Sequence, residues 1–167
     1  MRLTSPAALL LAAWLGAGIL FAAVVAPAAF AVLPSRTLAG ALVGKVLPTV
    51  FVAGMAIAVV AAVLDRGTAG RASRVRRVAL AVLAISCAVA QFVVGPRIER
   101  IRGEIGGPVE QLAPSDPRRT AFGRLHAISV AWLGLAMLSG ATAVVLMSIT
   151  PRTRTADAPD RALVASR

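Results

Sequence analysis

The sequence predicts an all-α membrane protein, a bundle of four transmembrane helices, and three observations lead there. The 167 residues are 58% hydrophobic and only 15% charged, with a mean hydropathy of +0.82, whereas soluble domains carry about 25% charged residues. The charges are clustered, and they leave four uncharged segments at 3–35, 46–64, 78–96 and 125–151. A helix needs about 20 apolar residues to cross a bilayer, so each segment is long enough to span once. The segments are apolar throughout rather than alternating, which excludes a transmembrane barrel.

The division of the chain follows from the same pattern. We expect a four-span membrane domain over residues 1–150 and a polar, arginine-containing cytoplasmic tail over 151–167 that is disordered. The chain has one cysteine, Cys87, which excludes an internal disulfide framework.

The first span begins after Arg2 and contains Pro27, which removes the hydrogen bond to the carbonyl of Ala23 and predicts a kink or an end there. The small residues around Phe30 also resemble a signal-peptide cleavage site. The apolar run is much longer than the 7–15 residues of a signal peptide, so we expect a retained span and leave cleavage as the alternative.

The second helix begins near Thr37 and continues into the segment 46–64. It contains the pair Gly40 and Gly44, a spacing that lets two membrane helices approach closely. In a chain this rich in alanine and glycine, chance is an equal explanation.

The third and fourth helices are expected to project beyond the bilayer. After Pro96, isoleucines recur at helical spacing among charged residues, which predicts a short amphipathic helix that stops at Gly106-Gly107. The sequence Ser115-Asp116-Pro117 then supplies a helix N-cap followed by proline at the first helical position.

The net charge of +11 points to lipid headgroups rather than nucleic acid, because the 17 arginines lie at the ends of the apolar segments without interleaved aromatic residues. Five of them separate the second and third spans: Arg66, Arg71, Arg74, Arg76 and Arg77. With both termini inside, ten basic residues are cytoplasmic and eight lie on the other side. This count favours cytoplasmic termini, and the heavy use of arginine over lysine suggests a bacterial source. We expect a multi-pass protein of the bacterial inner (cytoplasmic) membrane with both termini cytoplasmic.

A polar cluster is expected where the third and fourth helices lie antiparallel. Its members are Gln91 and Ser129, about one turn inside the membrane, and His126 at the interface, with Glu99, Arg102 and Arg124 just above them. The first interpretation is structural, with a hydrogen-bonded His126 that holds the two helices in register. The alternative is a functional site such as a proton relay, because ionisable groups inside membranes often mark pathways.

Catalysis and bound cofactors are not expected. A nucleophile needs an adjacent base, and a zinc site needs three or four ligands, whereas the chain has one histidine and one cysteine. We expect no cofactor and no dedicated metal site. A soft-ligand site for an ion such as Cu(I) is the competing hypothesis, and it would use Cys87, Met55 and Met137.

A resemblance to a known family rests on residues in both halves of the chain. They are Trp14-Leu15-Gly16, Pro27, Phe30, Ala39-Gly40, Gly44, Gln91-Phe92, Pro96, Ile98, Glu99, Arg102, Asp116-Pro117 and Phe122-Gly123-Arg124-Leu125-His126-x-x-Ser129. Over residues 8–149 this pattern resembles the transmembrane-protein-205-like family. The resemblance implies a small four-helix integral membrane protein without an established biochemical activity, some of whose vertebrate members are associated with tolerance of platinum compounds. The family motif falls on Gln91, Pro96, Arg102, Phe122, His126 and Ser129.

Two functions remain open from the sequence. The first is a non-enzymatic structural or interaction bundle that presents its extramembrane hairpin to a membrane partner or a second copy. The second is a small exporter or carrier of soft-metal or hydrophobic compounds that acts as an oligomer. The lipid bilayer is the expected partner in both, and nucleic acid in neither.

Overall fold

The computed structural model describes residues 5–65 and 70–149, and the described residues form helices and no strand. Four helical rods follow one another: α1 (Pro6–Leu20), η1 (Phe21–Val25) and α2 (Ala26–Val32); α3 (Arg36–Leu64); α4 (Arg71–Val89), η2 (Ala90–Val94) and α5 (Gly95–Ile105); and, after the short turn η3 (Val109–Gln111), α6 (Pro117–Ile149). The predicted all-α four-helix bundle is confirmed. The expected tail at 151–167 lies outside the described residues.

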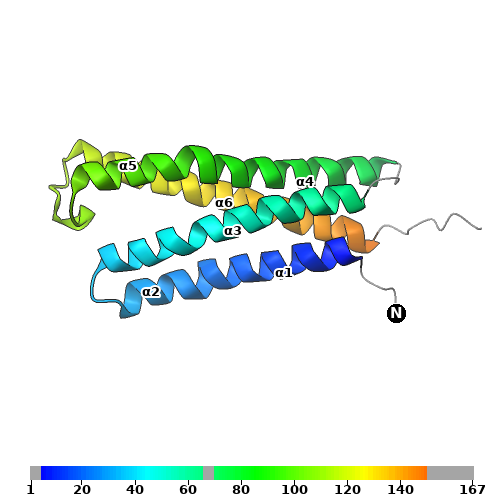
Figure 1. Cartoon of the computed structure of the whole chain (residues 1–167), viewed down its shortest axis with the longest axis horizontal. Helices are drawn as coiled ribbons and strands as arrows, with labels where there is room; N and C mark the ends of the chain where they lie inside the picture. Colours follow the sequence, from blue (N-terminus) through cyan, green and yellow to red (C-terminus); the bar gives the residue numbers. More distant parts are fainter. Residues whose placement is uncertain (1–4, 66–69, 150–167) are drawn as a thin grey trace, which may run out of the picture.

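The four rods run alternately up and down the long axis of the molecule (Figure 1). We call the end formed by residues 33–35 and 106–116 the hairpin end. The start of α1 and the last turns of α6 lie together at the opposite end (Figure 1). At the hairpin end, the tip of α2 and α3 is splayed away from α5 (Figure 1).

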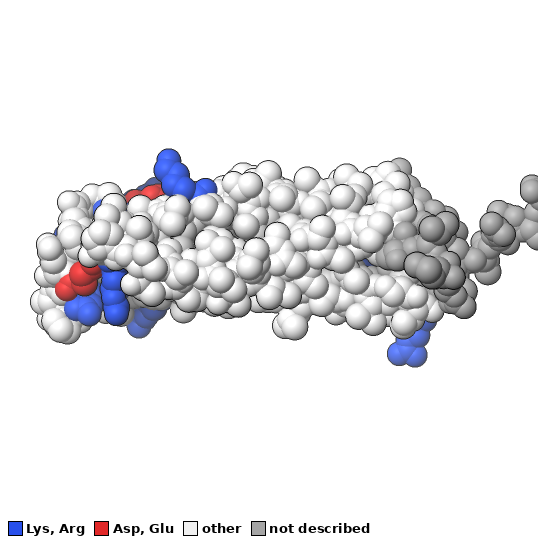
Figure 2. Space-filling view, turned by 90° about the horizontal axis from the view of Figure 1, so that it is seen from below, with Lys and Arg blue, Asp and Glu red and all other residues white. Residues whose placement is uncertain are grey.

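All four rods are long and apolar enough to cross a membrane, with 27, 29, 35 and 33 residues. A helix of 33 residues is about 50 Å long, against about 30 Å for the hydrocarbon core, so the third and fourth rods extend beyond the bilayer. Figure 2 shows the charged side chains gathered toward the ends, with an uncharged band between them. The chain is therefore a multi-pass integral membrane protein.

Local signals set the helix ends. The side chains of Ser5 and Ser35 accept hydrogen bonds from the backbone N–H of Ala8 and Leu38, so both serines are N-caps. Gly106 has a φ of +66°, a left-handed conformation that ends α5 as expected.

Two π turns allow prolines to lie inside the first and third rods. In η1 the N–H of Ala26 donates to the carbonyl of Phe21, and in η2 the N–H of Gly95 donates to that of Ala90. Each π turn comes directly before an X-Pro pair, at Pro27 and Pro96. Because proline lacks an N–H and crowds the preceding turn, the wider turn accommodates it. Of the two outcomes expected near Pro27, the helix does not end there: the π turn interrupts the α-helical pattern, and the rod continues helically to Val32.

The packed core lies between the middle of the bundle and the opposite end. Trp14 of α1 is only 4% exposed, and its indole N–H donates to the carbonyl of Val50 on α3 at 2.9 Å. Its ring occupies space left by two glycines. A Cβ at Gly54 would come within 2.7 Å of the ring, and one at Gly140 within 3.2 Å. Trp14 thus joins α1, α3 and α6, and Leu83 of α4 is fully buried beside Gly140.

A buried ion pair lies at the opposite end. The Arg76 guanidinium binds both oxygens of Asp65, at 2.6 and 2.7 Å, and their side chains are only 3% and 10% exposed. The interpretation of Arg76 as a charge in contact with lipid headgroups is therefore wrong, because it lies inside the bundle. Breaking such a buried, bidentate pair by removing one partner costs about 3–5 kcal/mol.

The close fit of Trp14 against Gly54 predicts opposite effects for two glycine substitutions. Gly54→Ala should lower the free energy of unfolding in detergent by about 1–3 kcal/mol, because the added methyl overpacks the ring. Gly134→Ala is the control, since nothing lies within 4 Å of the position that its methyl would take, and it should raise stability by up to about 1 kcal/mol through helix propensity. Equal effects of the two changes would contradict the packing described.

Candidate functional site

A cleft of about 1130 Å³ opens at the hairpin end, between α3 on one side and η2, α5 and α6 on the other. It is lined by Phe30, Arg36, Thr37, Gly40, Ala41, Val43, Gly44, Lys45, Leu47, Pro48, Phe51, Ala90, Gln91, Gly95, Pro96, Ile98, Glu99, Arg102, Gly106, Gly107, Pro108, Val109, Glu110, Arg119, Phe122, His126 and Ser129. We call it the hairpin-end cleft. It occupies the half of the bundle that the core does not fill.

Arg102 bridges this cleft. From α5 its guanidinium donates to Glu99 Oε1 and, on α3, to the carbonyl oxygen of Gly40, both at 3.1 Å. The guanidinium carbon also lies 5.6 Å from the ring centre of Phe122 on α6, within the range of a cation–π contact. One side chain therefore ties three helices together at the hairpin end.

The glycine pair on α3 makes room for this guanidinium. A Cβ at Gly40 would come within 3.2 Å of Arg102 Nη2, and one at Gly44 within 2.9 Å of Nη1. The Gly-x-x-x-Gly spacing thus serves a side chain rather than the backbone of another helix. The motif and the arginine are each visible in the sequence, but nothing there connects them, because 58 residues separate Gly44 from Arg102.

The three inner members of the predicted cluster all line the cleft. Gln91 comes from η2, and His126 and Ser129 from α6. Within residues 5–65 and 70–149 none of their side chains makes a hydrogen bond; His126 instead stacks on Phe122, with ring centres 6.4 Å apart and planes 10° apart. The expected hydrogen-bonded His126 is not found. The polar groups are directed at the cleft rather than at each other.

The outer members of the predicted cluster separate. Glu99 and Arg102 line the cleft and form the ion pair already described, whereas Arg124 is exposed and lies outside the lining. Arg124 is therefore not part of the site.

The residues of the soft-ligand hypothesis lie elsewhere. Cys87 is fully buried in the core, and Met55 and Met137 pack against that core from α3 and α6. None of the three lines the hairpin-end cleft. Among the described residues there is no group of three or more His, Cys, Asp or Glu side chains that could hold a metal ion.

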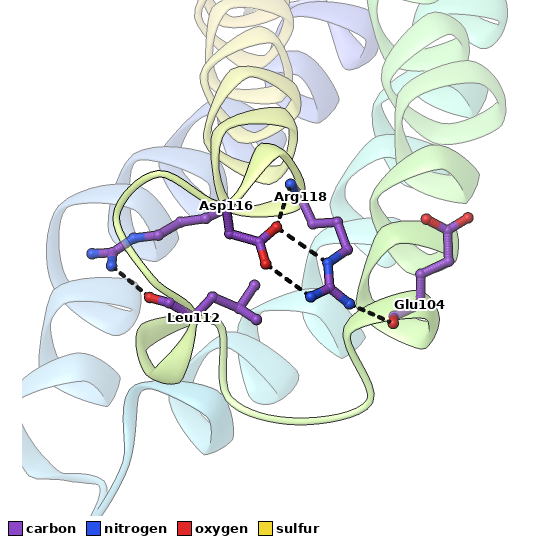
Figure 3. Close-up of polar contacts among 5 residues, drawn as sticks. Glu104, Leu112, Asp116 and Arg118 are labelled. Carbon is purple, nitrogen blue, oxygen red and sulfur yellow. Dashed lines mark hydrogen bonds and ion pairs between the residues drawn. The ribbon is translucent and has the colours of Figure 1, made fainter.

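The connection between α5 and α6 is fixed by hydrogen bonds beside the cleft (Figure 3). Asp116 accepts from the backbone N–H of Arg118 at 2.8 Å, which makes it the expected N-cap of α6, and it also pairs with the Arg118 guanidinium at 2.8 Å. Arg118 reaches on to the carbonyl of Glu104 at 3.3 Å, and Arg119 donates to that of Leu112. Hydrogen bonds from Arg118 hold the pKa of Asp116 below its usual value.

The rim of the cleft is basic. Its cations are Arg36, Lys45, Arg102 and Arg119, against the acids Glu99 and Glu110. The Thr37 hydroxyl donates to Glu110 at 3.5 Å, a weak link across the mouth. Arg36 and Lys45 were interpreted from sequence only as charges that set topology, because nothing in the local pattern places them opposite α5 and α6.

Comparison with known proteins gives one match. The family model described as "Domain of unknown function (DUF4149)" matches residues 9–106, which include the first three rods and Arg102 but not α6. No curated protein and no solved structure matches the chain.

The contact between Gly44 and Arg102 predicts a difference between two otherwise equivalent substitutions. Gly44→Ala and Gly103→Ala both gain helix propensity, but only the first displaces the guanidinium. We expect Gly44→Ala to be less stable than Gly103→Ala by about 1–2 kcal/mol, as for a hydrogen bond to a charged group. In an Arg102→Ala background the difference in unfolding free energy should vanish, and its persistence would show that Arg102 is not the cause.

The lowered pKa of Asp116 predicts a pH effect confined to acid. The carboxylate stabilises the start of α6 fully above its ordinary pKa of about 3.9, and this contribution is lost as the pH falls through the lower value of the folded state. NMR titration should show the depressed pKa in the wild type and a rise toward the ordinary value in Arg118→Gln. Arg124→Gln, on the same helix, is the control and should leave the Asp116 pKa unchanged.

Proposed function

This chain belongs to the DUF4149 family, and on that premise we propose that it is a non-enzymatic membrane protein that binds a partner in its hairpin-end cleft. The bundle serves as a rigid support in the bilayer. The hairpin formed by α5 and the start of α6 closes one wall of the cleft, with Arg102 holding that wall against α3.

One observation carries this proposal: the cleft contains polar side chains without partners. Ser129 is 6% exposed and lines the cleft, and within the described part of the chain its hydroxyl makes no hydrogen bond. Gln91, which is half-buried, and His126, which is exposed, line the same cleft, and within the described residues their side chains make no hydrogen bond either. A buried polar group is normally hydrogen-bonded, and binding sites are clefts with a few polar groups that converge on one space. The unpaired hydroxyl of the buried Ser129, beside the accessible side chains of Gln91 and His126, is therefore typical of a binding site.

The arrangement favours binding over catalysis. A serine nucleophile needs a hydrogen bond to its base, and Ser129 and His126 face the cleft without one. Binding is also favoured over export, which is the second candidate. The cleft ends near Phe51, Ala90 and Ser129, and side chains around Trp14 fill the bundle beyond it. A carrier would therefore need several chains, and its soft donors Cys87, Met55 and Met137 would have to act from the core.

The orientation and the wider relationship are part of the same proposal. We place both termini in the cytoplasm of a bacterial cell and the hairpin end on the far side of the inner membrane, on the count of basic residues. The relationship to the transmembrane-protein-205-like family is likewise proposed, on the motif from Phe122 to Ser129, which lies beyond the matched residues 9–106.

Photo-crosslinking at two adjacent positions tests the binding function. Ala41 lines the cleft, whereas Leu42 is exposed and points elsewhere. A photoreactive amino acid at position 41, introduced into the full chain in native membranes, should give defined adducts that position 42 does not give. Identical adducts at both positions, or none at 41, would contradict a partner in the cleft.

A flux measurement tests the alternative. Vesicles containing the purified chain should release tetraphenylphosphonium or Cu(I) no faster than empty vesicles. Release that depends on the chain, and that is lost in Cys87→Ser with Met55→Leu while the fold survives, would replace binding with export.

A further inference from the structure

We propose that the hairpin-end cleft binds one anionic phospholipid, with the phosphate at the basic rim and an acyl chain along the apolar wall. This inference rests on the proposed binding function and specifies its ligand class. It is based on the change from charged lining residues at the mouth of the cleft to apolar residues at its inner end.

The lining is graded from charged to apolar along α3. Arg36 stands at the mouth, Lys45 lies nine residues further along α3, and Phe51 lies six residues beyond Lys45 at the inner end, which corresponds to about 14 Å and then about 9 Å of helix. Below Lys45 the α3 wall is apolar, with Leu47, Pro48 and Phe51. A ligand that fills this space needs a charged end and an apolar part.

The rim selects for negative charge because two of its cations are not neutralised. Arg36 and Lys45 have no ion pair with any described residue, whereas Arg102 is paired with Glu99 and held by Gly40. Arg119 donates to the Leu112 carbonyl and retains its charge. An anion at the mouth thus meets cations from both walls, α3 and α6. Basic pockets between membrane helices are suited to anionic headgroups.

The cleft lies at the level where a lipid presents its headgroup. Lys45 on α3, Arg97 on α5 and Arg124 on α6 are the last charges before the uncharged segments 46–64, 78–96 and 125–149. The rim is therefore at the membrane interface, and the apolar part of the cleft is at the depth of the acyl chains. A phospholipid reaches this position without leaving its leaflet.

The unpartnered polar groups fit the ester region of such a lipid. Ser129 lies five residues inside Arg124 on α6, which is about 8 Å below the charged level. Its hydroxyl and the amide of Gln91 are hydrogen-bond donors, and the ester carbonyls of a phospholipid lie just below the phosphate. Phosphate, ester and acyl chain each meet a matching part of the lining.

Native mass spectrometry of the full chain in an uncharged detergent tests this proposal. The probes are dioleoyl phosphatidylglycerol and dioleoyl phosphatidylcholine, which share acyl chains and differ in net charge. We expect the wild type to retain the anionic lipid at least tenfold better. Each cation near a headgroup contributes about fivefold, so the double variant Arg36→Gln with Lys45→Gln should lose roughly 25-fold in retention.

The matched control is Arg97→Gln with Arg124→Gln. These two arginines are exposed at the same interface but lie outside the lining, so their removal should change retention less than twofold. Thermal unfolding must be the same for both double variants. If the variant Arg36→Gln with Lys45→Gln fails to fold, glycerol 3-phosphate is added to the wild type at a concentration equal to that of the lipid. Displacement of the lipid would show that only the anionic group is recognised. Retention of the lipid would support binding of an acyl chain along the apolar wall.

Several other results would contradict the lipid proposal. The proposal would be overturned if the two double variants lost the anionic lipid to the same extent. It would also be overturned if the wild type retained the two lipids equally. A crosslink from position 41 to a second copy of the chain would overturn it as well. If position 41 captures a different protein while neither lipid is preferred, the binding function stands and the lipid assignment falls.

Discussion

The guanidinium of Arg102 is the contact on which the hairpin end depends. It takes its hydrogen-bond acceptors from two helices, Gly40 on α3 and Glu99 on its own α5, and it lies over Phe122 of α6. Arginine suits this position because its planar fork binds two acceptors at once and stacks on an aromatic ring, which lysine cannot do. Among residues 5–65 and 70–149, the other links between α3 and the α5–α6 hairpin are the weak Thr37–Glu110 hydrogen bond and the packing deeper in the bundle.

Different interactions stabilise the two ends of the bundle. Toward the opposite end, small residues let four helices close around Trp14, and a buried ion pair between Asp65 and Arg76 joins α3 to α4. Toward the hairpin end the cleft opens between α3 and the α5–α6 hairpin, and Arg102 joins its walls through the Gly40 carbonyl and the Phe122 ring. The proposed binding cleft therefore lies directly above a tightly packed support.

The sequence predicted the fold well because lipid imposes strong rules. Charges mark the ends of the spans, and the N-cap at Asp116 and the stop at Gly106 follow from local chemistry. It predicted the site only in part. Gln91, His126 and Ser129 were found because polar residues are rare inside membranes, but the roles of Gly40, Gly44, Arg36 and Lys45 depend on a neighbour more than 50 residues away. The burial of Arg76 was missed for a different reason: its partner Asp65 is only 11 residues away, but an arginine in a basic segment gives no sign that it will pair inside the bundle.

The π turn η2 has a further consequence for the direction in which α5 faces. A π turn inserts one residue beyond the regular α-helical repeat, and each residue turns a helix by about 100°. Everything that follows η2 is therefore rotated by that amount relative to an uninterrupted rod. With this rotation Arg102 points across to α3; without it, the same sequence would present a neighbouring flank of α5 to the cleft. The additional residue in η2 changes the rotational register between α4 and α5. The apolar span and its charged extension can therefore face different neighbours and still form one continuous rod.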